Sequence, residues 1–181
     1  MTPKVLHVVR RVARAASPSQ WCVRGVVLLA PQVTLLAGGL AGAEVRWWVV
    51  VLVAFAALTT AVQPDGHAAG VTLFLLVVFW WWSVPSASGA GVLVAAAAMI
   101  ALHVGATLAA YGPSTLEIAA DLVRVWVRRA LLLWAVAFAA WAMARLAPPG
   151  GVSLVLALVL VAGVAWWAAV RFGPAAVSGE R

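Results

Sequence analysis

Three residues of one apolar segment, His103, Thr107 and Tyr111, have side chains that could do chemistry. They recur at intervals of four, so a helix places an imidazole, a hydroxyl and a phenol on one face. An ionisable residue in a membrane-spanning segment is costly and is by default a functional candidate. We interpret the three as a buried polar stripe. It either lines a polar cavity and relays a proton, or it leaves His103 neutral with one hydrogen bond to a neighbouring helix.

Other constellations for catalysis or metal binding are weak. Asp65 and His67 resemble an acid/base pair, but no nucleophile or oxyanion site accompanies them, and their Pro-Asp-Gly-His context is typical of a tight turn. His67 and His103 are expected about 12 Å apart in depth, from 1.5 Å per helical residue, and no third ligand has the usual spacing. Cys22 is the single cysteine, so no internal disulfide forms. The sequence thus predicts no catalytic residue, metal, cofactor or enzymatic activity.

A charged stripe is the second candidate site. It opens with the capping-box spacing Ser-x-x-Glu and predicts a cytoplasmic helix over residues 114–129 that either continues into the next apolar segment or lies flat on the membrane. Its charged positions recur at intervals of four, three and four, acidic first and basic afterwards. We expect this stripe to contact a partner protein through Glu117, Asp121, Arg124 and Arg128.

The elements that position these residues follow from the composition. The chain of 181 residues is 66% hydrophobic and 9% charged, whereas roughly a quarter of the residues of a soluble domain are charged. Seven of its eleven tryptophans form clusters near the ends of apolar runs, at 47–48, 80–82 and 166–167, where indole favours the membrane interface. We predict an all-α transmembrane bundle over residues 22–172, with six spans at 22–41, 47–62, 69–84, 90–111, 130–146 and 152–171.

The basic residues set the predicted orientation. With both termini in the cytoplasm, ten of the twelve Lys and Arg residues fall on the cytoplasmic side, and only Arg46 and Arg145 do not. The net charge of +7 is therefore read as orientation and attraction to anionic headgroups rather than as nucleic-acid binding. Residues 1–21 form either a basic amphipathic helix at the interface or a solvated tail, and residues 173–181 form a cytoplasmic tail. The Ala-, Val- and Arg-rich, Lys-poor composition suggests a bacterial plasma membrane.

Small residues predict where helices pack closely. Helix faces made of small residues let the backbones of two helices approach closely. Such packing allows helices to associate where lipid provides no hydrophobic effect, either within the bundle or against another subunit. We expect such contacts at Gly38 and Gly42, which have GxxxG spacing, and at Ala97, Ala101, Gly105 and Ala109. Pro31 is expected to interrupt the first span, and the neighbouring Gln32 and Thr34 to satisfy the carbonyl that it frees.

Short motifs resemble those of a bacterial family. Gln63-Pro64-Asp65-Gly66-His67, Leu102-His103 and Ala109-Ala110-Tyr111-Gly112-Pro113 are similar to segments of small uncharacterised actinobacterial multi-pass membrane proteins. Such proteins are encoded beside MoxR-type AAA+ ATPases and von Willebrand factor A-like proteins. The resemblance covers roughly residues 45–145 and implies no known activity. It implies a partner class, a cytoplasmic ATPase assembly.

Three functions remain after these exclusions. The favoured hypothesis is a non-enzymatic membrane subunit or scaffold, embedded in the lipid bilayer, that assembles other membrane subunits and couples to a cytoplasmic ATPase through the charged stripe. The alternative is a transporter or channel component with a polar path along His103, Thr107 and Tyr111. The third is an intramembrane or lipid-modifying enzyme, which requires polar groups from several spans at one depth.

Overall fold

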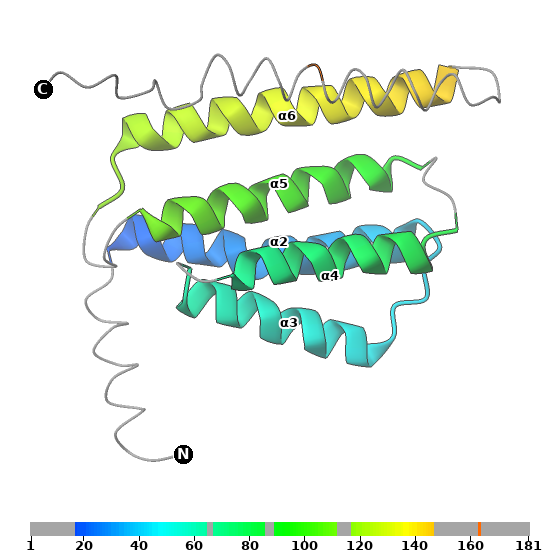
Figure 1. The fold of residues 1–181 in the computed structure, drawn as a ribbon, viewed down its shortest axis with the longest axis horizontal. Coiled ribbons are helices and arrows are strands. Elements are labelled where there is room, and N and C mark those ends of the chain that lie inside the picture. The colour runs from blue at the N-terminus through cyan, green and yellow to red at the C-terminus, as the bar shows by residue number, and fades with distance from the viewer. Residues whose placement is uncertain (1–16, 65–66, 86–88, 112–116, 147–162, 164–181) are drawn as a thin grey trace, which may run out of the picture. The chain divides into compact units, whose positions relative to one another are not determined.

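A computed structural model describes residues 17–64, 67–85, 89–111, 117–146 and 163, and these residues form an all-α structure (Figure 1). They fall in two compact units, residues 1–131 and 132–181, with the boundary inside the last described helix. The five helices of this part of the chain are α2 (Pro18–Leu40), α3 (Trp47–Val62), α4 (Ala68–Ser83), α5 (Gly91–Ala110) and α6 (Ala120–Leu146). Residues 1–16, most of the predicted sixth span and the tail lie outside the described residues.

Helix α2 begins earlier than the apolar pattern predicts. The Ser17 hydroxyl accepts a hydrogen bond from the Gln20 amide at 3.4 Å, and Pro18 occupies the first turn, where its missing N–H costs nothing. The helix ends at Leu40, and Gly42 follows with a φ of +90° in the turn toward α3. Gly42 is therefore a turn residue, and its predicted role in a GxxxG helix contact is wrong.

Pro31 does not interrupt α2, which continues through it to Leu40. A proline removes the hydrogen bond to the carbonyl four residues before it, here that of Val27. The Thr34 hydroxyl donates instead to the Ala30 carbonyl at 3.0 Å. The prediction that Thr34 satisfies the freed carbonyl is therefore wrong, because a threonine hydroxyl on a helix reaches the carbonyl of its own preceding turn.

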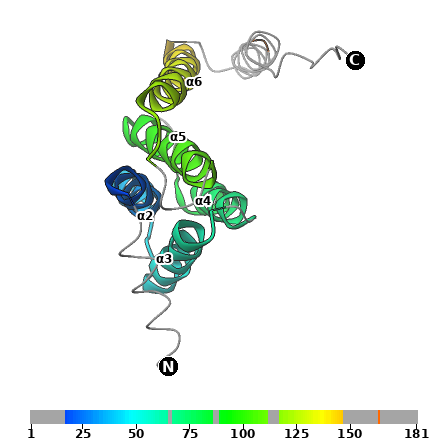
Figure 2. The same ribbon diagram turned by 90° about the vertical axis from the view of Figure 1, so that its left-hand side faces the viewer.

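Helices α2, α3, α4 and α5 form a bundle in which every pair is in contact (Figure 2). Successive helices run in opposite directions, as short connections require (Figure 1). The most extensive interface is that of α2 with α5. The buried positions of both helices recur at intervals of three and four, the spacing of helices packed along a seam. They include Val27, Ala30, Thr34 and Ala37 on α2, and Ala95, Ala98, Leu102, Gly105 and Ala109 on α5.

Glycines allow α2 and α5 to approach backbone to backbone. A Cβ added at Gly91 would lie 2.9 Å from the Ala37 carbonyl oxygen, and one added at Gly105 would lie 3.1 Å from a Val27 methyl carbon. Gly38 plays the same part toward α4, since a Cβ there would meet the Phe79 ring at 2.7 Å. Both distances under 3.0 Å are shorter than side-chain contacts allow, so larger residues would force the helices apart.

The small stripe predicted on α5 lies only partly at this interface. Gly105 and Ala109 are buried, Ala101 is partly buried, and Ala97 is exposed. Ala97 is therefore not part of the packing within the described bundle, and its contact with another subunit stays a prediction. The seam runs through Ala95 and Ala98 instead, because the buried face follows alternating steps of three and four rather than constant steps of four.

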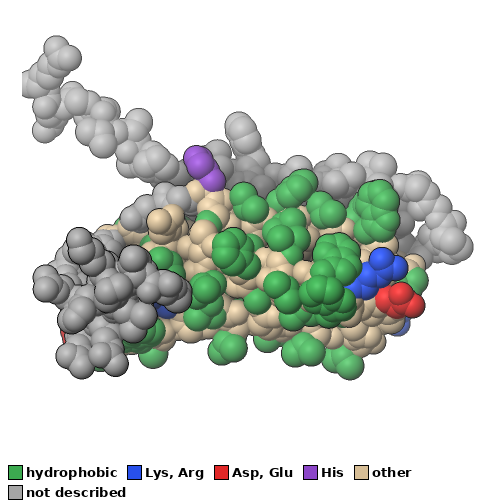
Figure 3. All heavy atoms as spheres, turned by 90° about the horizontal axis from the view of Figure 1, so that it is seen from below, with side chains coloured by type: hydrophobic (Ala, Val, Ile, Leu, Met, Phe, Trp, Pro, Cys, Tyr) green, Lys and Arg blue, Asp and Glu red, His purple; other side chains and the backbone are tan. Residues whose placement is uncertain are grey.

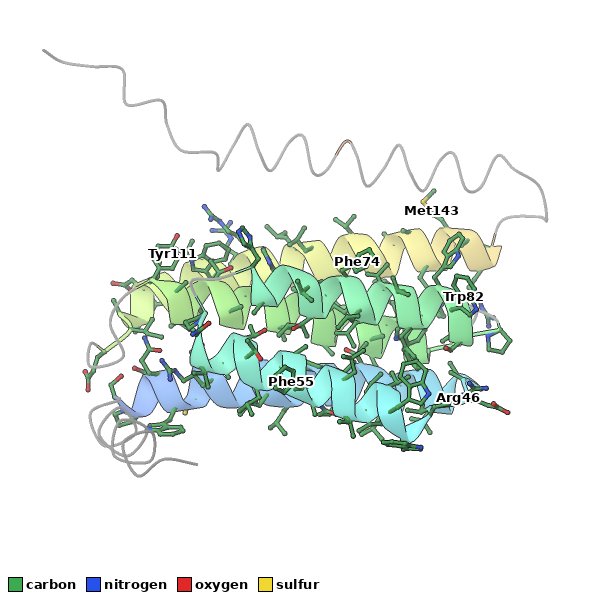
Figure 4. All side chains as sticks on the ribbon, turned by 60° about the horizontal axis from the view of Figure 1, so that its bottom comes forward. Arg46, Phe55, Phe74, Trp82, Tyr111 and Met143 are labelled. Atoms are coloured by element: carbon green, nitrogen blue, oxygen red, sulfur yellow. The ribbon has the colours of Figure 1, made fainter. Side chains whose placement is uncertain are left out.

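The outer surface of the bundle carries many large apolar side chains. Phe55 of α3, Phe74 of α4 and Trp82 of α4 are 69%, 65% and 84% exposed, and Figure 4 shows them on the outside of their helices. Much of the buried core consists of alanine and threonine side chains. Helices α2 and α5 are long and apolar enough to cross a membrane, and α3 and α4 are shorter apolar helices.

Helix α6 is one uninterrupted helix of 27 residues, about 40 Å long at 1.5 Å per residue. It passes without a break from the predicted cytoplasmic stretch into the predicted fifth span. Residues 117–119 are not helical, so the expected start near residue 114 is wrong, and Glu117 precedes the helix. The Ala119 carbonyl accepts from the Val123 amide, which places the first turn there.

The α2–α5 contact predicts the effect of one methyl group. Gly91→Ala should lower the free energy of unfolding by about 1–3 kcal/mol, because the new Cβ meets a backbone carbonyl that cannot turn away. Gly70→Ala, in α4, is the matched control, since a Cβ there meets no described atom within 4 Å. It should be neutral or stabilise by roughly 0.5–1 kcal/mol. Unfolding in detergent followed by circular dichroism measures both, and equal stabilities would contradict the close approach.

Candidate functional site

Threonines supply most of the polar groups buried inside the described bundle. Thr34, Thr60 and Thr72 are fully buried, and each hydroxyl donates to the carbonyl four residues earlier, at 2.8–3.0 Å. Thr59 and Thr107 make the same bond on less buried faces. This local bond satisfies a hydroxyl where water is absent.

Thr60 and Thr72 also join two helices. Their hydroxyl oxygens lie 3.1 Å apart, across the α3–α4 interface. Each hydroxyl has one hydrogen, so of three contacts (two to carbonyls and one between the hydroxyls) only two are hydrogen bonds at any moment. In each arrangement both hydroxyl hydrogens are donated, and the bond between the two hydroxyls joins α3 to α4. On the same bundle, the Trp80 indole of α4 donates to the Thr34 carbonyl of α2 at 3.4 Å.

The predicted buried polar stripe on α5 is not buried. His103 and Tyr111 are exposed and Thr107 is half-buried, and none of them lines either of the two grooves described below. The Thr107 hydroxyl is held by the His103 carbonyl at 2.8 Å, and the Tyr111 ring packs against Trp126 with centroids 6.1 Å apart. The prediction of a buried stripe is wrong because α5 is apolar on every side, so its sequence pattern does not show which face turns inward.

Two buried side-chain atoms near the start of α2 have no hydrogen-bond partner among the described residues. Gln20 is 2% exposed, and its Oε1 accepts no hydrogen bond from the described residues. The Nε of Arg24, one turn further along α2, is also buried without a described partner. A nearby bond fixes this end of α2, since the Ile118 amide donates to the Ser19 hydroxyl at 3.2 Å. The segment before α6 is therefore anchored to the start of α2.

An elongated groove lies between α3 and α4 and has a volume of about 760 Å³. Its floor is formed by the buried side chains of Val53 and Phe79. Its sides are apolar side chains of both helices, with Trp48 and Trp82 among them. Glu44, Arg46 and Ser83 lie at one end, because α3 begins where α4 ends. A second, smaller groove of about 530 Å³ lies between α2 and α3 and is almost entirely apolar.

The charged stripe lies at the surface, as a contact site requires. Glu117, Asp121, Arg124 and Arg128 are all exposed, although only the last three are on the helix. Arg124 and Asp121 form an ion pair at 2.8 Å with side chains 78% and 89% exposed, which contributes little to stability. The neighbouring Arg129 guanidinium lies 5.2 Å from the Trp126 ring centroid, a cation–π distance.

Comparisons with known proteins add no family. No family model, curated protein or solved structure matches the chain. Within the described residues, no three His, Cys, Asp or Glu side chains are arranged to hold a metal ion.

Sequence reasoning missed the groove and the threonine pair. The signal for the pair was present, since threonines 60 and 72 are the polar residues nearest the turn between two apolar helices. A hydroxyl that faces inward and one that faces lipid have the same sequence context, however. The groove has no sequence signal, because its apolar lining is like every other face of α3 and α4.

The threonine pair predicts a measurable coupling. Thr60→Val and Thr72→Val should each lower stability by at most about 1–2 kcal/mol, because the remaining hydroxyl keeps its bond to its own helix. A double-mutant cycle should give a coupling energy of roughly 0.5–1.7 kcal/mol. Thr59→Val, which removes a hydroxyl bonded only to the Phe55 carbonyl, is the control and should be nearly neutral. Strictly additive effects of the two substitutions would contradict the interhelical bond.

Proposed function

We propose that the chain is a non-enzymatic integral membrane subunit, a six-span scaffold of the bacterial plasma membrane that assembles a larger complex. The observation that supports it best is the many large apolar side chains that are exposed on the outside of the bundle, while alanines and locally bonded threonines supply much of its interior. Soluble monomers rarely expose a contiguous apolar patch of more than a few hundred Å². Lipid tails accept such a surface without cost.

The positions of the charges support the same conclusion. Helices α3, α4 and α5 contain no Asp, Glu, Lys or Arg residue, and α2 contains only Arg24. Glu44 and Arg46 lie in the turn between α2 and α3. Figure 3 shows a basic and an acidic side chain beside each other at one end of a face that carries hydrophobic side chains along its length. Charges at the ends of apolar helices are expected where those ends meet the headgroups.

The helix lengths fit a membrane with modest adjustment. Helix α5 has 20 residues and spans about 30 Å, the thickness of a hydrocarbon core. Helices α3 and α4 have 16 residues each and span about 24 Å. Short spans are accommodated by local thinning and by flanking residues that reach the interface, and Trp47, Trp81 and Trp82 are well placed for this.

The partner contact is assigned to the charged stripe at the start of α6. In the proposed topology, this stripe and the α2–α3 turn lie on opposite sides of the membrane. The stripe presents acidic and basic groups, and its four charged residues are all exposed. The resemblance to proteins encoded beside MoxR-type ATPases supports a cytoplasmic ATPase assembly as the partner. Transport along His103 is not proposed, since no observation favours a path there.

The topology is tested with single cysteines in a Cys22→Ser chain. Glu44→Cys should react with a membrane-impermeant maleimide on intact cells, because the α2–α3 turn is placed outside. Glu117→Cys should react only after permeabilisation. The two positions are both exposed and serve as controls for each other. Labelling of both from the same side would overturn the six-span arrangement.

The partner contact is tested by charge reversal. Glu117→Arg with Asp121→Arg should lower co-purification of the cytoplasmic partner at least tenfold, equivalent to about 1.4 kcal/mol of binding free energy. The fold should persist, because the exposed pair that is lost contributes at most about 1 kcal/mol. Glu44→Arg, at the other end of the bundle, is the control and should leave the complex intact. Unchanged co-purification of the double variant would refute this contact.

A further inference from the structure

We propose that the groove between α3 and α4 binds one phospholipid with a zwitterionic, primary-amine headgroup, of the phosphatidylethanolamine type. The inference rests on the proposed membrane location. To that location it adds a specific ligand and its binding site. The acyl chain lies along the groove, and the headgroup lies at Glu44 and Arg46.

The groove has the shape that an acyl chain requires. Along α4 it extends from Leu75 to Ser83, which is about 12 Å at 1.5 Å per residue. Half of a hydrocarbon core is about 15 Å, so the groove covers most of one leaflet. Val53 and Phe79 close its floor, and Leu52 and Val78 form its sides. A flexible chain in this groove would be in contact with protein on three sides.

The charges at the end of the groove select the headgroup. Glu44 and Arg46 are exposed, and neither forms an ion pair with another described residue. A phosphate beside Arg46 and a primary ammonium beside Glu44 would pair both groups through charge-assisted hydrogen bonds. A quaternary ammonium has no hydrogen to donate to Glu44, and an anionic headgroup without an amine would be repelled by it.

Two further features lie at the headgroup level. Trp48 and Trp82 line the groove, and indole rings favour the interface between acyl chains and headgroups. Helix α3 begins directly after Arg46, and no side chain caps its first turn. The positive end of the helix dipole therefore adds to the attraction of Arg46 for a phosphate.

Native mass spectrometry of the delipidated full chain in detergent tests the proposal. Lipids with ethanolamine, choline and glycerol headgroups and identical acyl chains are titrated separately. The ethanolamine lipid should bind at least fivefold more tightly than the other two. Glu44→Gln should reduce its affinity to that of the choline lipid, and Arg46→Gln should weaken the binding of both. Equal affinity of the unmodified chain for all three lipids would overturn the headgroup assignment.

A matched pair of substitutions tests the location. Val78→Trp fills the groove and should lower the affinity for the ethanolamine lipid at least tenfold. Val77→Trp adds the same ring to an adjacent exposed position that does not line the groove, and should change the affinity less than twofold. Equal effects of the two substitutions would overturn the site. So would a dimer that Val78→Trp dissociates, since a second copy would then occupy the groove.

The topology experiment separates the two proposals. Opposite-sided labelling of positions 44 and 117 together with unselective lipid binding would refute the lipid site and leave the membrane scaffold standing. Labelling of both positions from the same side would refute the six-span membrane arrangement on which both proposals rest.

Discussion

The close approach of α2 and α5 is the constraint on which the bundle depends. A Cβ at Gly91 would meet the Ala37 carbonyl oxygen, so the backbones would have to move apart, and one at Gly105 would press on a Val27 methyl group, which would have to shift by a few tenths of an ångström. In a lipid environment, burial of apolar surface supplies little drive for helix association, so packing of backbone against backbone has to provide it. Several bulky residues of these helices, such as Leu29, Leu36 and Val94, lie on the outer surface, whereas Leu35 and Leu102 are buried.

The interior reached in this way is apolar but not free of polar groups. Threonine hydroxyls bond to their own helices, and one pair reaches across from α3 to α4. Burial of such a hydroxyl costs little free energy, because its hydrogen-bond acceptor belongs to the same helix. Gln20 and Arg24 are exceptions, each with a buried side-chain atom that no described group satisfies, and both lie near the start of α2. Chemistry that needs charge is thereby displaced from the bundle interior to the ends of the helices.

The two ends present different surfaces. The α2–α3 turn places Glu44 and Arg46 at the mouth of an apolar groove, a combination suited to an amphiphile with a small charged head. The start of α6 places Asp121, Arg124 and Arg128 on an exposed helix, a surface suited to a soluble protein.

The sequence by itself determined the helical class and the positions of the helices between residues 47 and 110. Predicted and observed bounds agree there within one residue. They agree because the long apolar runs end at turns that contain glycine, proline and charged residues. It also determined which charges lie at helix ends. Only the tertiary structure decided which face of each helix is buried, since α3, α4 and α5 are apolar all round and carry no amphipathic pattern. His103 is consequently outside, Thr60 and Thr72 meet inside, and a groove opens between two helices whose sequences do not distinguish its lining from any other face.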